Sequence, residues 1–542
     1  MNIYKFISQS LVIILFSLSF QHVRAAGEIQ IIPQPQKVEL TSNQFVLTKD
    51  TKIQYIGSNA KPIADRLAEL LSKSSGFSFF SLKNAGQNTI VFQLGSNSSA
   101  NIEAYTLTST PTKIIVKAAS PNGLFYGFQT LRQLFPPAIE LQNSNATHWT
   151  IPGVNIEDAP LYPYRGLHLD VSRHFFDKKF IMKYIDMMAM YKYNKFHWHL
   201  TDDQGWRIEV KRYPQLTKTS AYRIESKGDT TGGFYTQQDI KEIVAYARER
   251  FVEVIPEIEM PGHAQAVLAA YPEFSCSGGP FKVETTWGIF NDVFCAGNDK
   301  TFEFLENVLD EIVPLFPSKY IHIGGDECPK IRWERCVKCQ ARMKRENLWT
   351  EHELQGYFMK RIEKHLQEKG KRIIGWEEVL EGGVSKSATI MSWLSLKAGT
   401  QAAQQGNDVI MCPEKLCYFD HYQGLETEEP EAFGYGRFLP LKAAYSFNPM
   451  PKELSSEQAT HILGGQANVW TEYMPTTQQV EYMVYPRALA FIETLWLKPE
   501  SKDFKAFESK IPSQYERLKN AGINFSKSWD KESTKTKWAN FK

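Results

Sequence analysis

Between residue 161 and about residue 500, short apolar segments alternate with longer segments whose apolar residues recur every three or four positions. The longer segments predict amphipathic helices at Lys179–Tyr191, Gln237–Arg250, Phe302–Leu315, Glu353–Glu368 and Thr477–Phe491. The short segments predict eight buried strands: Gly166–Val171, Lys195–Leu200, Val252–Ile258, Tyr320–Gly324, Arg372–Trp376, Thr389–Trp393, Val409–Cys412 and Ile462–Val469. Eight strands separated mostly by helices predict a (β/α)₈ barrel (TIM barrel) over residues 161–500.

The pattern before residue 161 is different and predicts a smaller α/β domain over residues 27–160. Strands are expected at Glu28–Ile32, Thr89–Leu94 and Lys113–Ala118, followed by a helix at Asn122–Leu134 that Pro136 and Pro137 end. Residues 501–542 should add a last helix, at Phe504–Leu518. From Phe525 onward we expect a polar tail.

The first 26 residues have the features of a signal peptide. Lys5 supplies a positive charge, Leu11–Phe20 is almost entirely apolar, and Val23–Ala26 offers small residues for cleavage. A membrane-spanning helix needs ~20 apolar residues, so this run is too short. We therefore predict an exported protein, periplasmic or secreted, without stable membrane insertion.

Composition narrows the classes of partner. The chain is 42% apolar and 23% charged, as soluble globular proteins are, and its formal net charge is only +2. The absence of a basic block in the sequence argues against nucleic acid as a partner. Aromatic residues make up 13% of the chain. Sugar-binding clefts are one explanation for this, but a large core is the simpler one.

Seven cysteines leave the redox state open. They are Cys276, Cys295, Cys328, Cys336, Cys339, Cys412 and Cys417. Export permits disulfides, and an odd number leaves at least one thiol unpaired. A Cys276–Cys295 disulfide could staple a loop, and Cys412 with Cys417 could close a short one. Cys336 and Cys339, with Cys328 nearby, resemble half a zinc site, but no second pair follows at zinc spacing. Disulfides are favoured over free thiols and over a metal, and no metal or cofactor is predicted.

Barrel enzymes carry their chemistry at the carboxyl ends of the strands, so the residues that follow each predicted strand are the candidates for a site. Acids and tryptophans dominate: Arg173; Asp202 and Asp203; Glu257, Glu259 and His263; Asp326 and Glu327; Trp376, Glu377 and Glu378; Trp393; Tyr418 and Asp420; Trp470 and Glu472. Polar residues in barrel loops are common, and a tryptophan at a strand end is often part of the core. Taken together, the set predicts a pocket of carboxylates walled by aromatic rings, which suits a sugar.

The segment from His322 to Glu327 is the strongest single element. Gly324 and Gly325 allow the chain to turn sharply out of a strand, and they place two adjacent acids at the barrel mouth. Two like charges this close raise the pKa of one of the acids. One can then donate a proton near neutral pH while the other stays ionised. A surface turn with two solvated acids is the simpler alternative.

Several longer segments resemble family 20 glycoside hydrolases, the β-N-acetylhexosaminidases. In the barrel these segments are residues 165–174, 197–206, 256–263 and 324–327. In the first domain, residues 33–35 and 123–131 resemble the family's N-terminal accessory domain. The resemblance covers nearly the whole mature chain.

The resemblance implies an exo-acting, retaining enzyme that removes terminal β-linked GlcNAc or GalNAc from glycans. In this family the substrate's own acetamido oxygen is the nucleophile, so the mechanism departs from the two-carboxylate scheme. By similarity Glu327 is the general acid and base, and Asp326 orients the acetamido group and stabilises the positive charge. The expected partner is a glycan with a terminal N-acetylhexosamine, and no cofactor is implied.

The remaining matches are expected to bind substrate. Arg173 would hold the 3- and 4-hydroxyls, Asp202 and His263 would form a network with Glu327, and Tyr418 would donate to the acetamido oxygen. Trp376, Trp393 and Trp470 would enclose the acetamido methyl, and Asp420 and Glu472 would bind the 4- and 6-hydroxyls. Arg165 lies at the start of a strand and is read as structural. No tryptophan for a second sugar is evident: residues 428–437 offer only Phe433 and Tyr435.

Three other functions compete with this reading. A relative that releases a disaccharide would need open space beyond Arg173 and Glu472. A glycan-binding protein that has lost catalysis should lack one of the two acids, and both are present. A metal-dependent hydrolase could use Asp202, His263, Asp326 and the cysteines, but the two-histidine helix motif is missing from the sequence.

Overall fold

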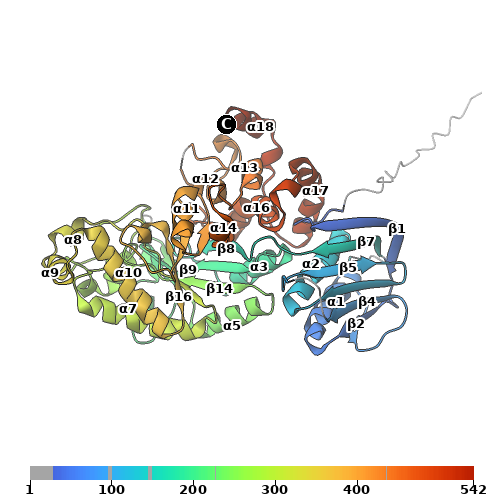
Figure 1. Ribbon diagram of the computed structural model, residues 1–542, viewed down its shortest axis with the longest axis horizontal. Helices are drawn as coiled ribbons and strands as arrows, with labels where there is room; N and C mark the ends of the chain where they lie inside the picture. Colours follow the sequence, from blue (N-terminus) through green and yellow to red (C-terminus); the bar gives the residue numbers. More distant parts are fainter. Residues whose placement is uncertain (1–28, 96–99, 145–148, 226–227, 435, 542) are drawn as a thin grey trace, which may run out of the picture.

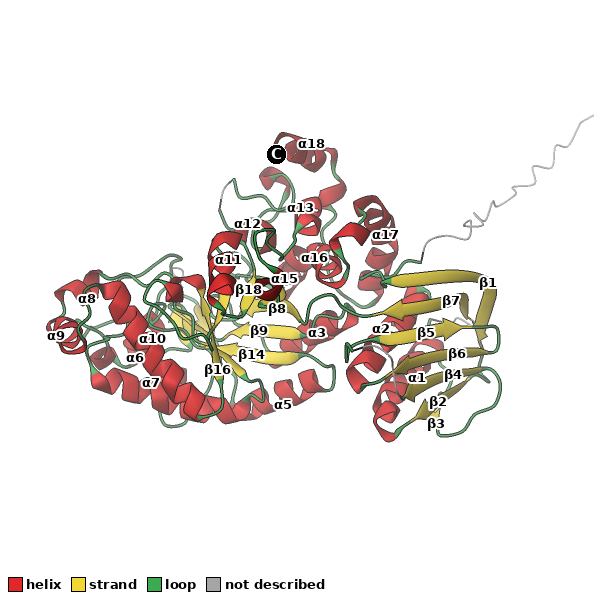
Figure 2. Cartoon of the chain, viewed as in Figure 1, coloured by secondary structure: helices red, strands yellow, loops and turns green. Residues whose placement is uncertain are grey.

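The computed structural model describes residues 29–541 except 96–99, 145–148, 226–227 and 435. Two bodies lie side by side along the longest axis, a sheet domain formed by the early chain and a barrel formed by the later chain (Figures 1 and 2). The C-terminal helices lie above the boundary between them in this view. The predicted signal peptide lies outside the described residues.

The first domain is a twisted sheet with two helices. Its strands are β1 (Lys37–Leu47), β2 (Lys52–Ile56), β3 (Ser81–Leu82), β4 (Thr89–Leu94), β5 (Tyr105–Ser109), β6 (Lys113–Ala118) and β7 (Trp149–Asp158). In the described residues they are ordered β1-β7-β5-β6-β4-β2-β3. Helices α1 (Lys61–Ser75) and α2 (Pro121–Leu134) pack on the sheet and on each other. Buried and partly buried residues alternate along β5 and β6, because the two faces of the sheet are covered to different extents.

The second domain is a closed barrel of parallel strands. The strands are β8 (Tyr164–Asp170), β9 (Lys195–His199), β14 (Glu253–Glu257), β15 (Tyr320–His322), β16 (Arg372–Trp376), β17 (Thr389–Ser392), β18 (Val409–Met411) and β19 (Ile462–Ala467). Most of their residues are buried, since one face meets the barrel interior and the other meets the surrounding helices. The predicted barrel and the preceding α/β domain are confirmed, and all eight predicted strands are present.

Helices surround the barrel. The longer ones are α3 (Lys178–Met190), α5 (Gln237–Arg248), α7 (Asp299–Ile312), α9 (Val337–Glu346), α10 (Glu351–Glu368), α11 (Leu396–Gln405), α15 (Thr477–Val484), α16 (Arg487–Trp496), α17 (Phe504–Asn520) and α18 (Glu532–Phe541). Shorter ones are α4 (Gln215–Lys218), α6 (Gln265–Ala270), α8 (Ile331–Arg335), α12 (Glu414–Cys417), α13 (Leu441–Ser446) and α14 (Ser456–Ala459). Short strand pairs lie in two of the loops: β10 (Thr201–Asp202) with β11 (Gly205–Trp206), and β12 (Tyr222–Ile224) with β13 (Thr230–Gly232).

Three predicted elements are wrong. The described part of Glu28–Ile32 forms no strand, because side-chain amides take the place of a neighbouring strand: Gln133 bonds both backbone groups of Ile32. The helix predicted over Thr477–Phe491 is two helices, α15 and α16, since Pro486 between them lacks the N–H that a continuous helix needs. The expected polar tail contains α18, which packs Trp538 against the core.

The predicted disulfides are also absent. All seven cysteines lie in the described part of the chain, and all seven are free thiols. Cys412 and Cys417 are fully buried near the barrel wall. Cys276 does not pair with Cys295. Instead, both approach Cys336 and Cys339 from another loop.

Buried charges join the first domain to the floor of the barrel. The Arg165 guanidinium, at the start of β8, donates to both carboxylate oxygens of Glu103 at 2.9 and 3.1 Å and to the Tyr126 hydroxyl on α2. The Cζ atom of Arg165 lies 5.2 Å from the centre of the Trp496 ring. Beside it, the Lys192 ammonium lies 3.3 Å from a carboxylate oxygen of Asp158. The structural role predicted for Arg165 is confirmed.

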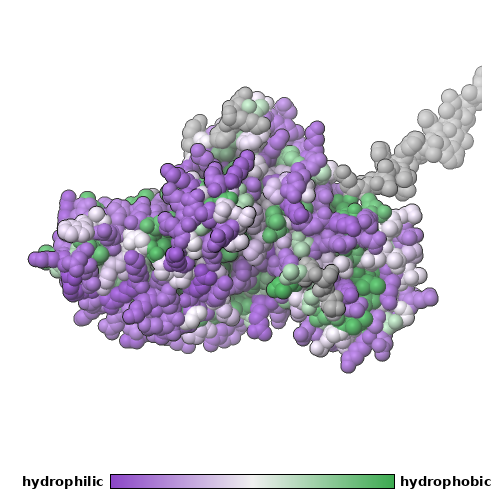
Figure 3. All heavy atoms as spheres, in the orientation of Figure 1, coloured by the Kyte–Doolittle hydropathy of each residue, from purple (hydrophilic) through white to green (hydrophobic). Residues whose placement is uncertain are grey.

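The face shown in Figure 3 is mostly hydrophilic, with smaller apolar patches over the first domain and near the boundary with the barrel. Among the described residues, no helix combines the length and apolar character that a membrane span requires.

We expect Glu103→Ala to destabilise the protein strongly, by about 3–5 kcal/mol, because it leaves the Arg165 guanidinium buried without its counter-charge. Chemical denaturation followed by tryptophan fluorescence measures this. Glu157→Ala is the matched control, since Glu157 pairs with Lys37 at an exposed position of the same domain. Equal shifts in the two variants would show that the Arg165 pair does not hold the domains together.

Candidate active site

A pocket of 290 Å³ opens at the carboxyl end of the barrel strands. All eleven residues predicted to act on substrate line it: Arg173, Asp202, His263, Asp326, Glu327, Trp376, Trp393, Tyr418, Asp420, Trp470 and Glu472. They come from the ends of all the strands of the barrel, because parallel strands present their carboxyl ends at one face.

The backbone after β15 positions the two adjacent acids. Gly324 has φ +64° and Gly325 has φ +99°, a region that side chains disfavour. A Cβ on Gly324 would lie 1.7 Å from a carboxyl oxygen of Glu259, so no other residue fits there. Glu327 itself has φ +44°, which is rare for a residue with a side chain and is typical of strained functional positions. The sharp turn predicted for this segment is confirmed.

Asp326 and Glu327 occupy different surroundings. The Asp326 side chain is 12% exposed, whereas that of Glu327 is 35% exposed. Burial raises the pKa of Asp326 to about 6, the His263 charge opposes this shift, and the charges of Glu257 and Glu327 add to it. One Asp326 oxygen is buried without a hydrogen-bond partner among the described residues. This oxygen can therefore accept a bond from a ligand.

His263 connects this pair to the acids after β9. Its Nδ1 lies 3.1 Å from oxygens of both Asp202 and Asp203, and its Nε2 lies 3.6 Å from Asp326 and 3.7 Å from Glu327. Burial lowers the pKa of His263, but the carboxylates around it outweigh burial and hold that pKa well above its usual value. The surrounding carboxylates thus favour the imidazolium form of His263, which faces both acids.

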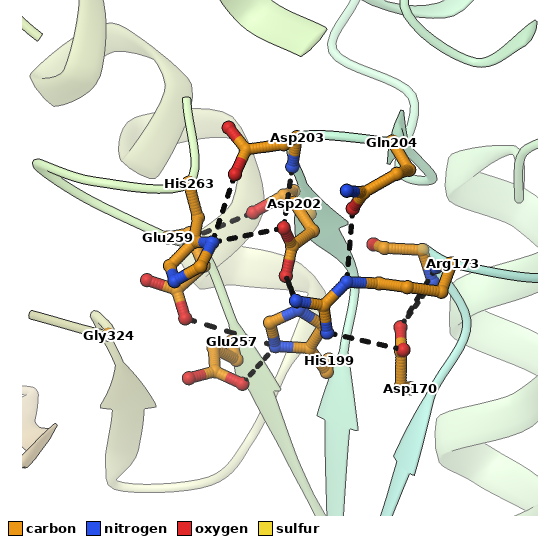
Figure 4. Close-up of polar contacts among 12 residues, drawn as sticks. Asp170, Arg173, His199, Asp202, Asp203, Gln204, Glu257, Glu259, His263 and Gly324 are labelled. Atoms are coloured by element: carbon orange, nitrogen blue, oxygen red, sulfur yellow. Dashed lines mark hydrogen bonds and ion pairs between the residues drawn. The ribbon is translucent and has the colours of Figure 1, made fainter. Parts of the chain in front are cut away.

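Arg173 anchors the opposite side of the network (Figure 4). Its guanidinium lies 2.9 Å from Asp202 and 3.4 Å from Asp170, and its Nε donates to the side-chain carbonyl of Gln204 at 3.0 Å. A Glu472 carboxylate oxygen lies 3.8 Å from the same guanidinium. Five donors in one plane suit two neighbouring acceptors, such as vicinal hydroxyl groups.

Asp202 has little capacity left for a further ligand. Besides Arg173 and His263, it binds His199 Nε2 at 2.8 Å and accepts the backbone N–H of Asp203 at 2.6 Å. Burial raises the pKa of Asp202, yet the charges of Arg173 and His263 outweigh burial and hold it well below its usual value. Asp202, Asp203 and His263 stand close enough to ligate a cation. However, the carboxylate oxygens of Asp202 and Asp203 already bind Arg173, His199, His263 and the backbone N–H of Gln265.

Aromatic rings form the remaining wall. The rings of Trp393 and Tyr418 stack with centres 6.1 Å apart, and Trp470 lies 6.0 Å from Trp376 and 6.4 Å from Tyr418. The indole N–H of Trp376 donates to Glu257 and that of Trp393 to Glu378. Since these polar atoms are bonded to the protein, the rings offer the pocket apolar surface. Such a box suits a methyl group.

Asp420 and Glu472 complete the pocket. Asp420 is buried and the Glu472 side chain is 12% exposed, and each has one carboxyl oxygen without a hydrogen-bond partner among the described residues. Burial and the nearby charge of Glu472 raise the pKa of Asp420 well above its usual value. Each side chain can therefore bond a hydroxyl group.

Four further residues line the pocket that the sequence did not assign: Leu394, Glu414, Phe433 and Arg437. Arg437 pairs with Glu414 and lies over the Phe433 ring, 4.7 Å from its centre. Phe433 belongs to residues 428–437, the segment that offers no tryptophan for a second sugar, and Tyr435 lies outside the described residues. Loop conformation brings these residues in, and no local sequence signal marks them.

Two sequence models of one family match this chain. "Glycosyl hydrolase family 20, catalytic domain" matches residues 162–499, and "Glycosyl hydrolase family 20, domain 2" matches residues 28–159.

Individual proteins that are similar to this chain support the same family. A β-hexosaminidase of Porphyromonas gingivalis is 46% identical over 92% of this chain, which spans only 64% of that protein's length. One of Vibrio furnissii is 37% identical over 86% of this chain and 76% of its own. Among solved structures, the GH20 β-N-acetylhexosaminidase of Streptomyces coelicolor A3(2) has a TM-score of 0.83 at 30% identity, covering 92% of this chain and 98% of that one. The chain therefore belongs to glycosyl hydrolase family 20, as its motifs predict.

Proposed function

We propose that this protein is an exo-acting β-N-acetylhexosaminidase. It would remove one terminal β-linked GlcNAc or GalNAc from the non-reducing end of a glycan. The observation that carries the proposal is one pocket in which adjacent acids face an aromatic box across the space of a single sugar. The names of the relatives agree, and a Vibrio harveyi enzyme with a TM-score of 0.83 was solved with N-acetylglucosamine.

The geometry supports a substrate-assisted reaction with retention. The acetamido oxygen of the substrate attacks the anomeric carbon while Glu327, the more exposed acid, gives its proton to the departing glycosidic oxygen. Asp326 accepts the acetamido N–H and stabilises the oxazolinium cation. Glu327 then takes a proton from a water molecule as that water attacks the anomeric carbon and opens the oxazolinium ring. General acid–base help of this kind contributes ~10²–10⁴-fold in rate.

The other residues position the sugar. Arg173 binds the 3- and 4-hydroxyls, Asp420 and Glu472 bind the 4- and 6-hydroxyls, and Tyr418 donates to the acetamido oxygen. Trp376, Trp393 and Trp470 enclose the methyl group, which holds the acetamido oxygen under the anomeric carbon, a proximity effect. Asp202 acts through His263, whose positive charge favours the ionised form of Asp326.

The size of the pocket favours release of a monosaccharide over a disaccharide. Its 290 Å³ lies at the small end of the ~300–1,000 Å³ that ligand pockets occupy. Arg173 and Glu472 stand where a disaccharide-releasing site would need open space. A binding protein without catalysis would have no use for the strained backbone at Glu327.

We expect Glu327→Gln and Asp326→Asn each to lower kcat/KM for the p-nitrophenyl β-GlcNAc glycoside by more than ~10²-fold. Glu381→Gln, at an exposed position, is the matched control and should keep full activity. A dinitrophenyl leaving group departs without protonation. It should therefore restore much of the loss in Glu327→Gln and little in Asp326→Asn.

Equal recovery of both variants with the dinitrophenyl glycoside would contradict the division of roles. If the native protein instead acted only on a p-nitrophenyl glycoside of a disaccharide, the disaccharide-releasing alternative would replace this proposal.

The acid limb of the pH profile should report Asp326. Its carboxylate is the working form and its pKa is about 6, so kcat/KM should fall as the pH drops through about 6. His263→Gln removes the positive charge that lowers this pKa, so the limb should move to higher pH. An unchanged limb in that variant would show that His263 does not control Asp326. Initial rates of the native protein and the variant, measured from about pH 4 to about pH 8, provide the comparison.

We also propose that the protein is exported, on the basis of its first 26 residues. Expression of the full chain in a bacterial host should give a mature protein that begins near Gly27. N-terminal sequencing of the periplasmic fraction checks this. A full-length chain confined to the cytoplasm would argue against export.

A further inference from the structure

Four cysteines from two loops converge beside the barrel. Cys276 and Cys295 come from the segment between α6 and α7, and Cys336 and Cys339 come from the start of α9. Their sulfur atoms all lie within 4.8 Å of one another. Cys295 and Cys339 are fully buried, Cys336 is nearly so, and Cys276 is partly exposed. Neither acid of the proposed reaction is a member of this cluster.

The spacing of the sulfur atoms identifies the kind of site. Three separations are 3.7 Å for Cys276–Cys339, 3.7 Å for Cys295–Cys339 and 3.8 Å for Cys295–Cys336. Zinc binds thiolates at about 2.3 Å in tetrahedral geometry, and a tetrahedron of that size has sulfur–sulfur edges of about 3.8 Å. A disulfide would require about 2.05 Å. The distances therefore match the edges of a ZnS₄ site.

The backbone around the cluster is built to hold it. Ser275 and Phe294 form an antiparallel bridge, and the Cys295 N–H donates to the Phe274 carbonyl. Cys276 and Cys295 therefore lie on neighbouring backbone segments. Gly297 packs against the other loop so closely that a Cβ would lie 2.1 Å from the carbonyl carbon of Lys338. Both pairs of cysteines are thus fixed by contacts other than their own sulfur atoms.

We propose that Cys276, Cys295, Cys336 and Cys339 bind a structural zinc ion. Four thiolates in tetrahedral arrangement select zinc over the harder divalent cations, and a site with four protein ligands has no open position for a reaction. The ion ties the loop that follows β14 to the loop that follows β15.

The proposed ion supports one side of the pocket. Phe294 donates its N–H to the Pro261 carbonyl, two residues before His263, and Trp333 donates its indole N–H to the Phe294 carbonyl. The same loop bonds Asp203 through the Glu284 N–H and Gln204 through the Thr286 carbonyl. Loss of zinc would therefore loosen the backbone that carries His263 and the partners of Arg173.

Metal analysis of the full chain, purified without a polyhistidine tag, tests the site independently of glycosidase activity. We expect about one zinc per chain by plasma mass spectrometry. A Cys336→Ser/Cys339→Ser variant should lose it, whereas Cys417→Ala, which alters a buried thiol outside the cluster, should keep it. Chelation of zinc from the native protein should lower the midpoint of thermal unfolding.

The redox state gives a second, separate readout. Native protein denatured with a chelator and alkylated without reductant should carry seven modified cysteines, the full number in the chain. Two disulfides within the cluster would leave three, with no zinc bound, and would overturn the proposal. Seven free thiols without metal, or iron in place of zinc, would overturn it too. These readouts hold even if the double variant fails to fold, because they use the native protein.

Discussion

The cost of burying negative charge governs the arrangement of the pocket. Asp202, Asp326 and Asp420 are buried, and the Glu472 side chain is only 12% exposed. An isolated buried carboxylate would take up a proton or destabilise the fold. Arg173, His199 and His263 offer positive charge within the network that holds these acids. Burial lowers the pKa of His199, but the carboxylates of Glu257 and Asp202 outweigh burial and raise it to about 10. Because all three cations contact Asp202, that acid remains ionised and serves as the fixed point between them. The acids farther from the cations receive less compensation.

Because the positive charges compensate the two adjacent acids unequally, Asp326 and Glu327 have different properties. Asp326 is the more buried, faces the His263 charge, and has a pKa raised to about 6 by burial. Glu327 reaches toward solvent from a strained backbone position. A group that must exchange protons with a leaving group and then with water benefits from that exposure. A group that must remain charged against a cation benefits from enclosure. One sharp turn at Gly324 and Gly325 therefore produces two chemical environments one residue apart.

Much of the barrel and of its pocket could be predicted from the sequence, because each strand and the loop that follows it have a local sequence pattern. Parallel strands buried on both faces appear as short apolar runs, and the loops that follow these runs carry the pocket residues. For that reason the boundaries of β16, from Arg372 to Trp376, agree with the prediction. Features that depend on distant partners were missed. Ile32 lacks a strand because Gln133 satisfies its backbone, and Phe433 and Arg437 enter the pocket through a loop whose course has no periodic signal.

The cysteine cluster shows the same limit most clearly. A zinc site is recognised in sequence when two pairs of ligands have short spacing within each pair. In this cluster only Cys336 and Cys339 are closely spaced in the sequence. Cys276 and Cys295 are brought together by the bridge between Ser275 and Phe294. The segment between them contains almost no regular structure, and long loops of this kind need an anchor if they are to position functional residues. A cross-link at the base of the loop fixes its ends without adding helices or strands, leaving its middle free to bond Asp203 and Gln204. The cysteine cluster thus stabilises the pocket wall as Arg165 stabilises the barrel floor. In both places, a few buried contacts join distant segments where regular structure ends.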